Sequence, residues 1–76
     1  MAVHAVFVKQ GILHEEPCAN LNEAHRLLDQ EERKAKARNV PFIRLAVRDA
    51  KDNYLESETN VSMVTLRLYY GKEELA

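Results

Sequence analysis

The sequence predicts an α+β domain in which one helix packs on one face of a three- to four-stranded, mainly antiparallel sheet, in the order β-α-β-β(-β). Segments 2–8 and 42–49 are dense in apolar residues with the two-residue period of strands. Segment 21–38 instead repeats its apolar residues at helical spacing. Since no second amphipathic helix is visible, we expect the other sheet face to stay open.

Length and composition favour a single globular domain over residues 1–76. Hydrophobic residues make up 46% of the chain and charged residues 30%, which excludes a disordered chain. No apolar run approaches the ~20 residues of a membrane helix, and the N-terminal segment lacks a signal-peptide pattern. A single cysteine, Cys18, cannot form an internal disulfide. We therefore expect a cytoplasmic protein with no membrane segment.

The first strand, 2–8, is apolar on both sides, which predicts a central position in the sheet. Gly11 ends this strand. Segment 12–17 is expected to be a connection, because Pro17 lacks the backbone N–H that a continuous ladder needs.

The helix is expected to begin after Asn20, whose side chain can accept a free backbone N–H while Glu23 reaches back toward the cap. Its first two turns carry an apolar stripe made of Leu21, Ala24, Leu27 and Leu28. Asn39 can end the helix in the left-handed conformation, and Pro41 prevents its continuation.

Strands are expected to follow the helix. After the strand over 42–49, segment 50–53 favours a tight turn through its Asp and Asn residues. The chain then returns antiparallel from Tyr54, either as a separate short strand over 54–58 or as part of one long hairpin. Segment 61–70 alternates and is expected to be the last strand, closed by Gly71.

Alternation within these strands predicts which residues face the helix and which face outward. The side expected to meet the helix consists of Ile43, Leu45, Val47, Val64, Leu66 and Leu68. The uncovered side is expected to bind a partner through Phe42, Arg44, Arg48, Met63, Arg67 and Tyr69.

Catalytic and metal sites are not expected, and neither is a cofactor. His14 and Cys18 are four residues apart, but a structural zinc site needs a second close pair of ligands, which the chain lacks. Cys18 could act as a nucleophile with His14 or His25 as its base, yet no orienting group or oxyanion-hole glycine is visible nearby. With only two glycines, the chain offers no phosphate-binding loop, and we expect no enzyme activity.

Arginine and aromatic side chains on an open sheet suit two kinds of partner. They can stack on single-stranded bases, but the net charge of −1 lacks the basic excess typical of nucleic-acid binding. The same residue types are enriched at protein interfaces. We therefore expect a non-enzymatic protein-binding domain whose partner is another protein or a second copy in a homodimer. A single-stranded nucleic-acid binder is the alternative. Base rates for small chains suggest a regulator or inhibitor, including those of mobile elements.

Overall fold

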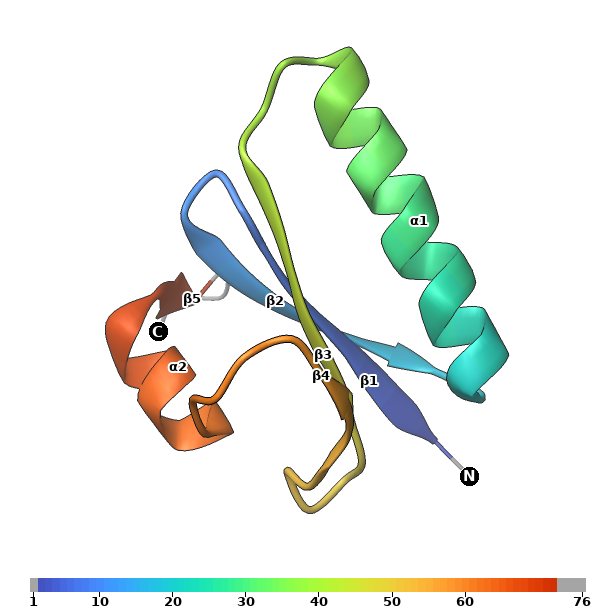
Figure 1. Cartoon of the computed structure of the whole chain (residues 1–76), viewed down its shortest axis with the longest axis vertical. Coiled ribbons are helices and arrows are strands. Elements are labelled where there is room, and N and C mark those ends of the chain that lie inside the picture. Colours follow the sequence, from blue (N-terminus) through green and yellow to red (C-terminus); the bar gives the residue numbers. More distant parts are fainter. Residues whose placement is uncertain (1, 73–76) are drawn as a thin grey trace.

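The computed structural model describes residues 2–72, which form one sheet with a helix on each face (Figure 1). The strand order is β4-β3-β1-β2-β5; the first four strands pair antiparallel, and the short β5 pairs parallel with β2. The elements are β1 (Val3–Lys9), β2 (Ile12–Cys18), α1 (Leu21–Ala37), β3 (Phe42–Arg48), β4 (Tyr54–Ser57), α2 (Met63–Tyr69) and β5 (Gly71–Lys72). The α+β fold class is thus confirmed. Residues 1 and 73–76 of the expected domain lie outside the described residues.

The predicted connection over 12–17 is wrong, because this segment forms β2 and pairs with the whole of β1. A tight turn joins the two strands, with Gln10 and Gly11 at φ values of 54° and 78°. Two consecutive positive φ values match the turn that two-residue hairpins prefer. Pro17 is tolerated since β5 covers only Ile12 and Leu13, so no described strand needs the N–H that Pro17 lacks.

The predicted start and end of α1 are confirmed. The Asn20 side chain accepts the N–H of Glu23 at 2.9 Å, and the Glu23 carboxylate accepts the N–H of Ala19 at 2.9 Å. At the other end, Asn39 adopts a φ of 62° and leaves the helix in the left-handed region. Local capping chemistry therefore fixes both helix boundaries.

The α1 side of the sheet holds one hydrophobic cluster. Its buried members are Val3, Ala5, Phe7, Cys18, Ala24, Leu28 and Val47. The predicted helix stripe is narrower than expected, since Leu21 is 36% exposed and Leu27 is only partly buried against the cluster. Leu28 is the large α1 side chain at its centre, with 2% exposure.

A bulge in β3 changes which side chains face α1. Val6 of β1 pairs with Ala46, but the next residue, Phe7, pairs with Arg44, so Leu45 is an extra residue in β3. Leu45 and Ala46 consequently both pack on the side away from α1, and the alternation of the strand changes phase there.

The phase change overturns part of the predicted face assignment. Phe42 and Arg44 lie on the α1 side, where Phe42 packs against the cluster around Phe7 and Arg44 pairs with α1 carboxylates. Ile43 is on the opposite side. The prediction was therefore wrong for these residues and for Leu45, and right for Val47, because strict alternation ends at the bulge.

The turn over 50–53 is confirmed, with the Asp49 carboxylate accepting the N–H groups of Lys51 and Asn53 at 2.8 and 2.9 Å. Beyond it, β4 forms a separate short strand against β3. The question of a separate strand or one long hairpin is thus answered by a four-residue strand followed by an irregular segment.

The predicted last strand over 61–70 is wrong: Met63–Tyr69 is the helix α2, whose N-cap Ser62 accepts the N–H of Thr65 at 3.3 Å. Met63 and Leu66, three residues apart, point to one side of this helix and are buried against the sheet. The second cluster consists of Val6, Val8, Leu13, Leu45, Ala46, Met63 and Leu66. The sheet face that was expected to be open is therefore partly covered by α2 (Figure 1).

Within residues 2–72, neither helix is both long enough and apolar enough to cross a membrane.

Candidate interaction surface

The six residues predicted to bind a partner do not share one face. Met63 is the buried first residue of α2, Arg48 is buried at the end of β3, and Arg67 of α2 is half-buried. Phe42 stacks on Phe7 on the α1 side, with ring centroids 5.3 Å apart. Arg44 also lies on that side, and of the six only Tyr69 is widely exposed, at 78%.

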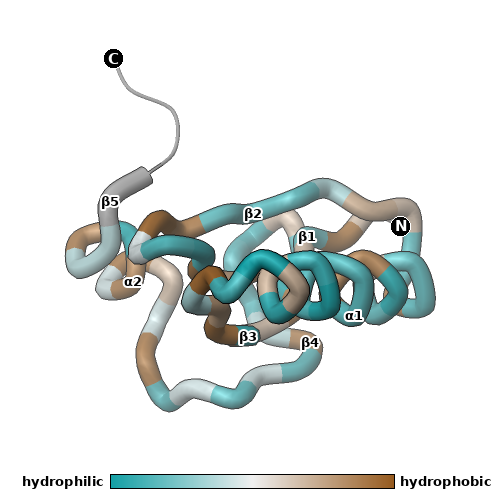
Figure 2. Tube along the Cα trace, turned by 90° about the horizontal axis from the view of Figure 1, so that it is seen from above, coloured by the Kyte–Doolittle hydropathy of each residue, from teal (hydrophilic) through white to brown (hydrophobic). Residues whose placement is uncertain are grey.

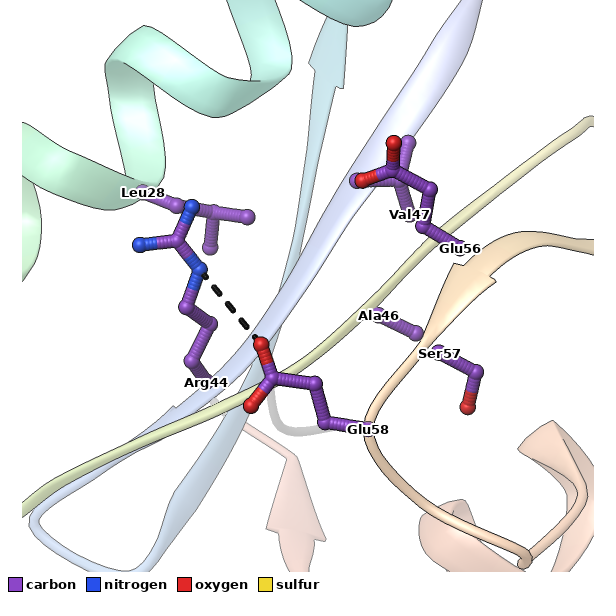
Figure 3. A pocket seen from close by; sticks show the side chains of 7 residues that line it. All are labelled: Leu28, Arg44, Ala46, Val47, Glu56, Ser57 and Glu58. Atoms are coloured by element: carbon purple, nitrogen blue, oxygen red, sulfur yellow. Dashed lines mark ion pairs between the residues drawn. The ribbon is translucent and has the colours of Figure 1, made fainter.

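Arg44 joins β3 to α1 by ion pairs. Its Nη1 atom lies 2.8 Å from Asp29 and 3.5 Å from Glu32. Its Nε atom lies 4.0 Å from Glu58, the ion pair drawn in Figure 3. The hydrogen bond with Asp29 raises the pKa of Arg44 and lowers that of Asp29. The guanidinium is therefore occupied by carboxylates of its own chain.

A small pocket of about 60 Å³ lies beside Arg44, between α1 and β4 (Figure 3). Glu56, Ser57 and Glu58 form its β4 side, and Leu28 lies at its α1 side. Glu56 also pairs with His25 of α1. Ligand pockets usually measure about 300–1,000 Å³, so this pocket is too small for a metabolite.

A wider recess of about 320 Å³ lies at the end of α1, lined by Lys9, Gln10, Glu31, Lys34, Ala35, Arg38 and Val40. Glu31 lies between two of its cations, 3.3 Å from Lys9 and 3.8 Å from Lys34. An anion in the recess would compete with this carboxylate and would also meet the negative end of the helix dipole. The recess is therefore poorly suited to phosphate.

On the side of the sheet that α2 covers, Arg67 donates hydrogen bonds to two carboxylates. Its guanidinium donates to both oxygens of Glu15 at 2.9 and 2.7 Å, and to both oxygens of Asp52 at 2.9 Å. Arg48 reaches the same Glu15 at 2.8 Å and donates to His4 Nδ1 at 3.2 Å. We call Glu15, Arg48, Asp52 and Arg67 the Arg67 ion cluster.

The Arg67 ion cluster connects four parts of the chain, since its members come from β2, β3, the β3–β4 turn and α2. Hydrogen bonds from Arg67 lower the pKa values of Glu15 and Asp52, and these carboxylates raise the pKa of Arg67. Bidentate contacts of this kind fix geometry and leave the arginine few donors for a ligand. The cluster therefore holds α2 on the sheet.

Cys18 is buried, and its thiol donates to the carbonyl of Glu16 at 3.6 Å. Burial raises the pKa of the thiol, which disfavours the nucleophilic thiolate. In the part of the chain that the structure describes, no three His, Cys, Asp or Glu side chains are grouped to hold a metal ion. That Cys18 is not catalytic stays a prediction.

The most exposed apolar side chains belong to α2. Leu68 is 82% exposed, Tyr69 78% and Val64 61%. The Tyr69 ring packs edge-on against Tyr70, with centroids 4.9 Å apart. Helical spacing places Val64 and Leu68 opposite the buried Met63 and Leu66, and Tyr69 lies to one side of this pair. We define the α2 outer face by the exposed residues of this helix, Val64, Thr65, Leu68 and Tyr69.

Of the α2 outer face, sequence reasoning named only Tyr69 as a partner-binding residue and assigned Val64 and Leu68 to the buried side. A helical interpretation of the same residues would have found the stripe, since Val64 and Leu68 are four residues apart. Figure 2 shows the contrast along the chain, with α1 mostly hydrophilic and α2 carrying hydrophobic stretches.

Comparisons of the chain with models of known protein families, with curated proteins and with solved structures gave no match.

Proposed function

We propose that this chain is a small non-catalytic protein-binding domain whose contact surface is the α2 outer face. The observation that carries this proposal is the exposure of Val64, Leu68 and Tyr69 together on one helix of seven residues. Single exposed apolar residues are common on protein surfaces, whereas grouped ones are typical of interaction sites. A tyrosine beside aliphatic side chains also matches the composition of interface cores.

The arginines that made nucleic acid the alternative partner favour a structural role. Arg44 pairs with carboxylates of α1, and both Arg48 and Arg67 pair with Glu15. Binding of a nucleic-acid backbone needs free cationic side chains, which neutralise phosphates and release the counterions bound to them. The α2 outer face contains no such side chain. These contacts support a protein partner. The chain has one cysteine and can form no internal disulfide, which supports the cytoplasm as its proposed location.

The proposal is tested by affinity capture from host lysate with the wild-type chain and with Leu68→Glu. Leu68 is nearly free of intramolecular contact, so this change should spare the fold while placing a charge on the surface. We expect the wild type to retain one protein in stoichiometric amount, whether a second copy or a different chain. Leu68→Glu should lose it, and nuclease treatment should have no effect.

Leu21→Glu is the matched control, since it makes the same chemical change on the other face of the sheet. Leu21 is 36% exposed at the first position of α1, where a carboxylate is favourable to the helix dipole. Equal loss in both variants, or capture that disappears with nuclease, would contradict the proposed function.

A further inference from the structure

We infer that the partner of the α2 outer face is a second copy of this chain, with the two α2 helices packed antiparallel across a twofold axis. The inference rests on the proposed function, because it names the occupant of the same surface. Three properties of α2 lead to it: the absence of charge on its outer face, the spacing of its apolar residues and its short length.

The first argument is charge. A twofold contact brings each surface group close to its own copy, so a face with charges of one sign repels itself. None of the residues of the α2 outer face is Asp, Glu, Lys, Arg or His. The one cation of α2, Arg67, is turned inward and neutralised by Glu15 and Asp52. Two copies of this face can therefore meet without repulsion between like charges.

The outer surface of α1 lacks this property. Arg26, Arg33, Lys34 and Lys36 are exposed there, and so are Glu23 and Asp29. A twofold contact through that helix would have to desolvate several of these charged side chains. Between the two helices of the described chain, α2 is thus the one suited to self-association.

The second argument is geometric. Val64 and Leu68 are four residues apart and lie one above the other on the same side of α2. In an antiparallel pair, Val64 would face Leu68 of the partner subunit, and the twofold axis would repeat this contact in reverse. This reciprocity is what a closed dimer requires. Tyr69 beside the stripe adds rigid apolar area at little cost in side-chain entropy.

The third argument concerns strength. A helix of seven residues is about 10 Å long at 1.5 Å per residue, so the contact is small. Interfaces of limited area belong to the weak and transient class. The dimer should therefore be weak and reversible. Complementary charges help to select one protein partner over another, and this face has none.

The experiment is sedimentation equilibrium of the untagged full chain over a wide concentration series. The wild type should rise from the monomer mass of 8.8 kDa toward twice that value as concentration increases. Leu68→Glu should remain monomeric over the same range, and Leu21→Glu should behave as the wild type. Circular dichroism of each variant verifies that the fold is retained.

A charge-exchange mixture tests the antiparallel pairing itself. Val64→Lys and Leu68→Glu should each be monomeric alone. When they are mixed, the introduced lysine and glutamate would face each other across the axis while the second Val64–Leu68 contact stays intact. Formation of a mixed dimer therefore supports the pairing, and its absence overturns it.

Two further outcomes overturn the inference. One is a wild type that stays monomeric at every concentration, and the other is a dimer unaffected by Leu68→Glu. In the first case, capture of a different protein that depends on Leu68 would leave the proposed function standing. Failure of both experiments would reject the surface altogether.

Discussion

The two helices pack on opposite faces of one sheet but differ in length and in where their charged and apolar residues lie (Figures 1 and 2). Helix α1 has 17 residues, mostly strong helix formers, with its apolar residues inward and its charges outward. Helix α2 has seven residues, including Val64, Thr65 and Tyr69, which favour strands. Its only cation, Arg67, is half-buried and paired inward, whereas Val64, Leu68 and Tyr69 are exposed.

This difference shows how each helix is maintained. α1 has local signals at both ends and ion pairs along its length, such as Glu32 with Lys36 at 3.9 Å. α2 is shorter than the ~12–15 residues that even a favourable isolated helix needs. Its helical state therefore depends on Met63 and Leu66 in the core and on Arg67 in the ion cluster. The following substitutions test this contrast.

The largest effect is expected for Leu28→Ala under α1. Leu28 is 2% exposed and lies in the cluster with Phe7 and Val47. Its truncation should lower the free energy of unfolding by about 2–5 kcal/mol through lost burial and a residual cavity. Urea unfolding measures this loss. Lys34→Ala, at an exposed position of the same helix, should stay within about 0.5 kcal/mol, and a similarly small value for Leu28→Ala would contradict the packing of α1.

Arg67→Met should be next, because it tests the ionic attachment of α2. The change keeps an apolar stem but leaves Glu15 with Arg48 alone and deprives Asp52 of two hydrogen bonds. We expect a loss of about 1–3 kcal/mol at neutral pH, measured by urea unfolding. An unchanged unfolding midpoint would mean that the apolar contacts alone retain α2.

The same ion cluster predicts a pH dependence. Arg67 lowers the pKa values of Glu15 and Asp52 in the folded chain. Their contribution is therefore complete above the ordinary carboxyl pKa of about 4 and is lost as pH falls through the lowered values. On acidification from neutral pH, the urea midpoint of the wild type should fall more steeply than that of Arg67→Met. Parallel curves would show that other carboxylates dominate.

Asn20→Ala should have a moderate effect and tests the local signals of α1. It removes the acceptor for the N–H of Glu23 and should lower the free energy of unfolding by about 1 kcal/mol. Asn20→Asp retains an acceptor at this position and serves as the control. If both variants unfold at the same midpoint as the wild type, the cap does not contribute to stability.

The smallest stability effect is expected for Leu68→Ser on the α2 outer face. With 82% exposure, Leu68 should contribute less than about 0.5 kcal/mol to the fold of the monomer, measured in dilute solution. At high concentration, the wild type should gain thermal stability through self-association while Leu68→Ser does not. A large loss in dilute solution would place Leu68 in the core instead.

The sequence by itself determined the fold class, the central position of β1, both ends of α1 and the turn after β3. The helix ends and the turn depend on signals that act within a few residues, such as the Asn20 cap and the left-handed Asn39. The fold class and the place of β1 follow from the distribution of apolar residues along the chain.

Tertiary structure alone decided the remainder. The Leu45 bulge arises from pairing with β1, and β2 accepts Pro17 because, within residues 2–72, β5 pairs with this strand only at Ile12 and Leu13. Segment 61–70 has a pattern that fits a strand, yet it becomes a helix because Met63, Leu66 and Arg67 reach the core and the ion cluster only from one side of that helix. The helical conformation also turns Val64 and Leu68 outward. It depends on contacts between residues far apart in the sequence, which a local pattern does not reveal.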